Sequence, residues 1–265
     1  MALSKIMVVI DPTQEQQPAF ERALDSARLT GARLHLYACL DPFPATSQPD
    51  SSADMCQGMM EILMGRAQAD GVEASSELEV ADNWRQHAVT AAARCSASMV
   101  FKNSQEHSQL DRQMRATSDW TLLRFSPCPV LLVKNFRDWK HRRVLAAINS
   151  VTSDEAHIKL NNQIISFTQR FSDAYGSDAH FVSAYKQHNR APSVAELADD
   201  CGAPEEHMHI VEGNASEVIT RTAEKIEADL IIIGTVGRTG LKGTVVGNTS
   251  EKLLDQTRSD VLVLN

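Results

Sequence analysis

Glycines gather at one point of this sequence, between an apolar run and a segment with helical character. The stretch 231–254 reads IIIGTVGRTGLKGTVVGNTSEKLL and holds five of the twelve glycines of the chain. Gly234 ends the apolar run, Gly237 follows three residues later, and Gly247 comes ten residues after that. Glycine is costly to order, so such a cluster indicates a backbone that must turn tightly or be approached closely.

The polar residues of the same stretch favour an anion as the group that approaches. Asn248 and Thr249 stand where a helix would begin, and Arg238 and Lys242 add positive charge to the loop. A glycine-rich turn before a helix N-terminus presents backbone N–H groups to phosphate oxygens. The pattern is neither a Walker A motif nor the dinucleotide motif GxGxxG. The alternative is a turn that only packs a helix against a sheet.

Other residue types offer little catalytic chemistry. The sequence has no Gly-x-Ser-x-Gly elbow and no cysteine with an evident adjacent base, so we predict no catalytic residue. His207 and His209 alternate on an expected strand and point to one face, but no third ligand is evident. We therefore interpret them as part of a solvated face and predict no metal site.

Composition limits the class of protein. The formal net charge is −8, which argues against nucleic acid as the main partner, because such proteins carry a basic face. The five cysteines are scattered and form no CxxC pair, which is typical of reduced thiols in a cytoplasmic protein. No cleavable signal pattern and no run of 18 apolar residues is present. We expect a soluble cytoplasmic protein without a membrane span.

The same order of elements occurs twice along the chain. Short apolar runs typical of buried strands alternate with helical segments, such as 20–31 and 154–171, and the connections are short. The expected strands lie within 5–11, 32–40, 75–82, 97–103 and 118–134 of the first copy, and within 142–149, 178–185, 207–214, 228–234 and 249–265 of the second. This alternation predicts an α/β fold with two tandem doubly wound domains, each a five-stranded parallel sheet flanked by helices.

The repeat also gives the domain bounds. We place the first domain at 1–134, a linker at 135–141 and the second domain at 142–265. Only the first copy has a long Pro/Ser-rich loop with a Met-rich helix, within 41–71. The residues near one face of this helix are Met55, Met59, Met60, Leu63 and Met64. They form either an ordinary core stripe or a surface for an apolar ligand or partner.

The spacing Gly-x2-Gly-x9-Gly, followed by a polar residue, a final helix and a strand, resembles the nucleotide-binding motif of the universal stress protein family. The resemblance to its UspA-like domains covers nearly the whole chain, twice, as in the tandem class. It implies a regulatory protein of the stress response that binds ATP or a related adenine nucleotide, with or without Mg²⁺. It also implies that the two domains pack through their last strands as an intramolecular pseudo-dimer, with further homo-oligomers left open.

The same resemblance assigns roles in the second copy. Asn149 stands at the end of the first strand, where the family has an Asp that holds the adenosine end, and Ala184 stands in the base pocket. The phosphate-binding positions are Gly234, Gly237, Gly247, Asn248 and Thr249. Asn149 and Asn248 depart from the family's Asp and Ser/Thr. Asn forms hydrogen bonds but carries no charge, so nucleotide contact persists while a metal-holding or base role weakens.

The first copy departs from the family in the opposite way. It keeps Asp11 at the first strand end, with Cys39 at the second, but it lacks the glycines. Their positions are occupied by Asn103, Glu106 and Ala116. Without glycine, a phosphate would meet side chains instead of free amides, so we predict that this degenerate domain binds no nucleotide in this way.

Three functions follow for the chain as a whole. The first is a tandem stress protein that binds a nucleotide in its second domain. The second is an interaction or apolar-ligand protein that uses the Met-rich helix and the long loop. The third is a weak ATPase, although efficient turnover is not expected without the carboxylate at position 149.

Overall fold

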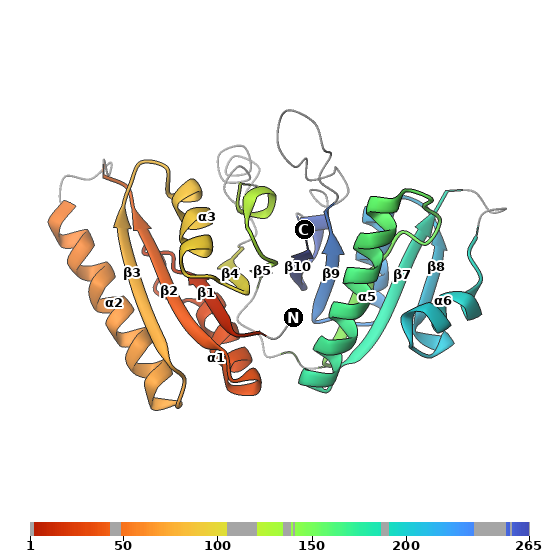
Figure 1. Ribbon diagram of the computed structural model, residues 1–265, viewed down its shortest axis with the longest axis horizontal. Coiled ribbons are helices and arrows are strands. Elements are labelled where there is room, and N and C mark those ends of the chain that lie inside the picture. Colours follow the sequence, from red (N-terminus) through yellow and green to blue (C-terminus); the bar gives the residue numbers. More distant parts are fainter. Residues whose placement is uncertain are drawn as a thin grey trace. The chain divides into compact units, whose positions relative to one another are not determined.

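The computed structural model describes residues 3–42, 49–104, 121–134, 139, 141–186, 191–235, 253–254 and 256–264. The chain forms two compact units, Met1–Phe136 and Arg137–Asn265, hereafter the first and the second unit. Each unit is an α/β structure built on a parallel sheet (Figure 1).

Strands and helices alternate in the first unit. Its strands are β1 (Lys5–Val9), β2 (Arg33–Leu40), β3 (Ala74–Val80), β4 (Met99–Asn103) and β5 (Val130–Val133). Its helices are α1 (Pro18–Thr30), α2 (Pro49–Ala69) and α3 (Trp84–Arg94), and residues 121–125 are also helical. The order across the sheet is β3-β2-β1-β4-β5, and all neighbours are parallel.

The second unit repeats this plan. Its strands are β6 (Arg143–Ala147), β7 (Asp178–Tyr185), β8 (Met208–Glu212), β9 (Leu230–Gly234) and β10 (Asp260–Leu264). Its helices are α5 (Glu155–Tyr175), α6 (Val194–Cys201) and α7 (Ala215–Lys225), with a short 3₁₀ turn at Glu205–His207. The order is β8-β7-β6-β9-β10, again parallel, so the predicted fold class is confirmed.

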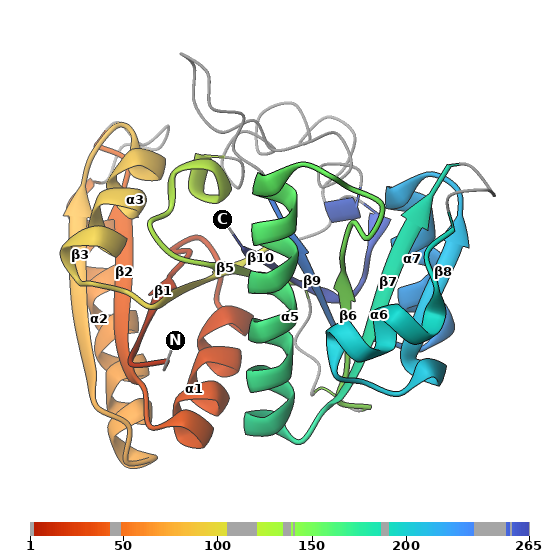
Figure 2. The same cartoon turned by 45° about the vertical axis from the view of Figure 1, so that its right-hand side comes forward.

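Apolar strands explain why both faces of each sheet are covered. β5 and β10 are buried along their whole lengths, which is typical of parallel strands between two layers of helices. The chain runs outward from β6 to β7 and β8 and then returns to β9 on the other side of β6. With right-handed crossovers, the helices of the outward path and the helix of the return path cover opposite faces of the sheet. In Figure 2, α5 and α6 lie in front of the strands of the second unit, and α7 lies behind them. The topology therefore brings the carboxyl ends of β6, β7 and β9 to one edge.

Helix starts follow polar caps in the second unit. Asp154 caps α5, Ser193 caps α6, and Asn214 caps α7 by accepting from the Ser216 N–H at 3.1 Å. Such caps satisfy N–H groups that the helix leaves unpaired.

Trp139, near the end of the predicted linker, packs on α5 and donates from Nε1 to Asp260 at 2.9 Å. Among the helices described, none has the length and apolar character needed to cross a membrane.

Candidate functional site

A pocket of about 470 Å³ lies at the carboxyl ends of β6 and β7 in the second unit. Asn149 comes from the segment after β6 and Ala184 from the end of β7, so both assigned strand-end positions line it. The other lining residues are Ala147, Ile148, Val151, Val182, Tyr185, Lys186, Ala215 and Ile219. In open α/β sheets, ligands bind outside the carboxyl ends of the strands, next to the point where the strand order reverses.

The backbone at Asn149 is fixed by one side chain of α5. Asn161 accepts from the Asn149 N–H at 3.0 Å, and its amide nitrogen donates to the Asn149 carbonyl at 2.8 Å. The next residue, Ser150, is held by its hydroxyl against the buried hydroxyl of Ser183. The Asn149 side chain is exposed, so its amide can both donate to a ligand and accept from it.

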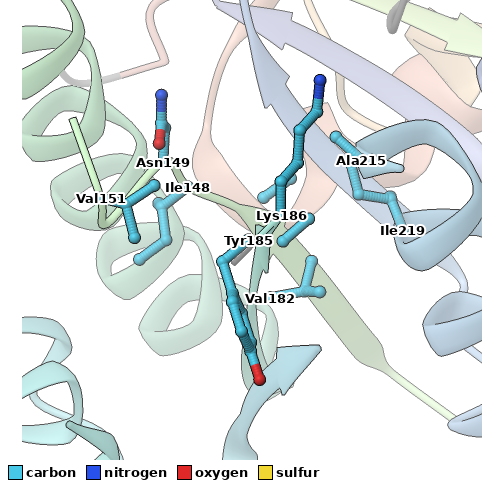
Figure 3. A pocket seen from close by; sticks show the side chains of 10 residues that line it. Ile148, Asn149, Val151, Val182, Tyr185, Lys186, Ala215 and Ile219 are labelled. Atoms are coloured by element: carbon cyan, nitrogen blue, oxygen red, sulfur yellow. The ribbon is translucent and has the colours of Figure 1, made fainter. Parts of the chain in front are cut away.

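The pocket combines apolar walls with two polar groups. Val182 and Ile219 are buried core residues, so the floor is apolar and firmly packed. In Figure 3, the Asn149 amide and the Lys186 ammonium group extend toward the same side, and the Tyr185 hydroxyl extends the opposite way. The described lining includes one cationic side chain, Lys186, and no carboxylate. This composition suits a ligand with an apolar body and an anionic part.

Gly234, at the end of β9, has a packing role. A Cβ atom there would lie 2.5 Å from Cδ2 and 2.6 Å from Cγ of Leu160, a buried residue of α5. Real Cβ contacts are essentially never this short, so only glycine lets Leu160 close over the strand end. Packing against Leu160 therefore explains a glycine at position 234 without a ligand.

We expect Gly234→Ala to destabilise the protein by about 1–3 kcal/mol, because the Leu160 side chain must shift in a packed core. Urea unfolding measures this change in the free energy of unfolding. Gly65→Ala in α2 is the matched control, since nothing lies within 4 Å of the Cβ position there. That control should stabilise α2 by about 0.5–1 kcal/mol. Equal effects of the two variants would contradict the packing role.

The other loop residues assigned from the sequence lie outside the described residues. They are Gly237, Arg238, Lys242, Gly247, Asn248 and Thr249. Their roles stay predictions. In the first copy, Glu106 and Ala116 likewise lie outside the described residues, whereas Asn103 is described.

Two buried side-chain amides lie at the corresponding edge of the first unit. Gln17 is 4% exposed; it donates to the carbonyls of Asp11 and Gln14 at 2.7 and 2.8 Å. Asn103, at the position of Gly234, is 8% exposed; its Oδ1 accepts from the Ala19 N–H of α1 at 2.6 Å, and its Nδ2 donates to Gln17. These amides bind protein backbone where the second unit has a glycine.

The Met-rich helix does not present its five assigned residues on one surface. Met60 and Leu63 are buried in the core of the first unit, while Met55 is 74% exposed. Met59 and Met64 are half-buried. The stripe that packs on the sheet comprises Cys56, Met60, Leu63 and Ala67, with spacings of four and three residues.

The expectation of a solvated face at His207 and His209 is wrong. Both are half-buried, and His180 of β7 lies beside them. The His180 and His207 rings stack with centroids 4.1 Å apart and planes inclined by 30°. Among the residues that the structure describes, no group of three potential ligands is placed to hold a metal ion.

Fold and site together define a class: two doubly wound α/β domains in tandem, one with a pocket at the strand-order reversal. The chain belongs to the universal stress protein family, whose model matches residues 3–134 and 165–265. It is similar to universal stress protein E of Escherichia coli K12, at 27% identity over 98% of this chain and 93% of that protein. The homolog in Haemophilus influenzae is 28% identical, over 99% of this chain and 97% of that protein.

Solved structures agree over the whole length. A functionally unknown protein from Pseudomonas aeruginosa PAO1 superimposes with a TM-score of 0.81 at 31% identity, covering 99% of this chain and 92% of the other. A universal stress protein from Archaeoglobus fulgidus gives 0.77 at 16% identity, covering 100% and 99%, which shows the shared fold. The chain is therefore a UspE-like tandem member of the family.

Proposed function

We propose that this protein is a regulatory stress-response protein that binds ATP or a related adenine nucleotide in the pocket of its second unit. The observation that carries the proposal is the convergence of Asn149 and Ala184, from two different strands, on one pocket. The family resemblance assigns both positions to the nucleotide.

The chemistry of the pocket supports a nucleoside at this place. Val182 and Ile219 offer apolar contact to a flat base, and the Asn149 amide offers hydrogen bonds to the base or the ribose. The glycine-rich stretch begins at Gly234, where β9 ends at the same edge of the sheet. The phosphates would extend toward that stretch, with Lys186 adding positive charge.

The lack of a carboxylate in the described lining favours binding over turnover. Mg²⁺ prefers carboxylate oxygens, and Asn149 offers only a neutral amide oxygen, so any Mg²⁺ would be held mainly by the nucleotide phosphates. Phosphoryl transfer needs such a metal and a group that orients water. We therefore place the protein among the regulatory members of its family, and phosphate release with ATP and Mg²⁺ tests for weak ATPase activity.

Filling the pocket should abolish binding. Ala184→Phe places a ring inside the space that the base would occupy, so we expect the affinity for ATP and AMP to fall by about 100-fold or more. Isothermal titration of the full chain measures this loss. Cys39→Phe, at the matching position of the first unit, is the control and should leave the affinity unchanged. Undiminished binding by Ala184→Phe would place the nucleotide elsewhere.

A further inference from the structure

Three histidines of the second unit form a cluster at the β7–β8 edge of the sheet. Nδ1 of His180 lies 3.2 Å from Nε2 of His209, and the His180 ring stacks on that of His207. Nδ1 of His207 lies 3.0 Å from the Ala179 carbonyl, to which it can only donate. Among the described strands of this unit, β8 is the outer one and pairs with β7, so the cluster lies across the β7–β8 pairing.

The hydrogen bond between His180 and His209 requires that at least one of the two imidazoles be neutral. A neutral ring can accept through one nitrogen and donate through the other, which lets His180 and His209 share a proton in a hydrogen bond. If both rings are protonated, two donors face each other. Stacked imidazolium rings also repel. The geometry therefore penalises protonation of the cluster.

The surrounding charges are mixed. Burial, with His207 and His209 adjacent, lowers the pKa of His180 to about 4; Asp178 opposes this shift, and Arg143 of β6 adds to it. Burial lowers the pKa of His209 as well, and Lys225 of α7 contributes. Glu205 and Glu206, in the turn before β8, are exposed.

The first unit has a histidine at the matching place with a different partner. His35 occupies the third position of β2, as His180 does of β7, and the registers Leu36–Ser76 and Phe181–Met208 coincide. His35 contacts the Ser75 hydroxyl at 2.9 Å and the Glu77 carboxylate at 3.2 Å. A carboxylate favours the protonated ring. At the same place in the two sheets, the first unit therefore pairs its histidine with a carboxylate, whereas the second unit pairs its histidine with other imidazoles.

We propose that the His180–His207–His209 cluster is a proton-operated latch, which holds β8 on β7 when neutral and releases β8 and the preceding turn when protonated. Because His180 and His209 bind protons more weakly in the folded chain, the stability that these two residues contribute is complete above pH 6.5, the ordinary pKa of His. It is lost as the pH falls from 6.5 toward 4.

Hydrogen exchange of the full chain, corrected for the intrinsic rate, tests the latch. Between pH 7.5 and pH 5, we expect the protection of β8 amides to fall by about tenfold or more, while that of β3 changes by less than about twofold. Equal changes in β3 and β8 would overturn the proposal. The β8 change should be the same with EDTA, and a profile that depends on the chelator would show that a bound metal is responsible instead.

Two variants distinguish the latch from a loss of stability at low pH that does not depend on the histidine cluster. His209→Glu gives His180 the carboxylate partner that Glu77 gives His35, so β8 should keep its protection at pH 5. His180→Gln removes the central ring but retains a hydrogen-bonding group, and should also flatten the pH response even if the strand is weaker at every pH. An acid loss as large as that of the parent chain in both variants would overturn the latch.

Discussion

Gly237→Val is expected to lower the affinity for ATP on the order of 100-fold, the largest effect of a single substitution in the glycine-rich stretch. In the proposed mode, the phosphates contact backbone N–H groups directly, and hydrogen bonds to a charged group are worth about 1.5–3 kcal/mol each. A β-branched side chain would keep the phosphates away from those groups. Isothermal titration gives the affinity, and circular dichroism checks that the fold is retained.

The first copy offers a matched control. Glu106 stands at the position that corresponds to Gly237, so Glu106→Val changes a comparable site in the copy that has no glycine motif. It should leave the affinity for ATP as it was. Unchanged affinity in Gly237→Val would contradict the phosphate-binding role of the loop without contradicting the base pocket. If Ala184→Phe still removed binding, the pocket would stand and the phosphate-binding role of the loop would fall.

The architecture was predictable because buried parallel strands leave a strong signal. Runs such as 230–233 and 144–148 are apolar on both faces, and the short connections leave few topologies. The strand order that places β6 between β7 and β9 is the one expected for right-handed crossovers with short connections. The start of α3 has no such signal, because its N-cap residue, Asn83, makes no side-chain capping hydrogen bond.

The site was predictable only where it depends on strand ends. The family resemblance assigns Asn149 and Ala184, and the expected strands place each of them at a carboxyl end. Asn161, which fixes the backbone at Asn149, and Ile219, in the pocket floor, come from helices whose rotation about their axes depends on packing. Their signal in the sequence is ordinary helical periodicity, which does not name a partner.

Histidine clustering shows the same limit at a sheet. The alternation of His207 and His209 was visible in the sequence, but their contact with His180 depends on the register between β7 and β8. A shift of one residue in that register would have turned the rings to opposite faces. Gly234 was read as part of a ligand loop, and its close approach to Leu160 depends on how α5 lies over β9.

The second large effect is expected in the first unit, where Asn103→Ala should lower the free energy of unfolding by about 2–3 kcal/mol. The Asn103 side chain is buried and accepts from the Ala19 N–H at the start of α1. It also donates to Gln17, which in turn binds the backbone of Asp11. Removing it leaves a buried donor on α1 and a buried acceptor on Gln17 without this partner.

Asn83→Ala supplies the control for that loss. Asn83 is the N-cap residue of α3, but its side chain makes no capping hydrogen bond, so its replacement should cost only a few tenths of a kcal/mol. Urea unfolding gives both free energies of unfolding. Hydrogen exchange shows whether the loss of stability in Asn103→Ala is located in α1, whose Ala19 N–H loses its acceptor. Similar losses in the two variants would mean that the Asn103 network adds no stability beyond an ordinary surface asparagine. A large loss confined to Asn103→Ala would instead explain why the first unit keeps an amide where the second unit has glycine: in the first unit, the strand end holds its own helix.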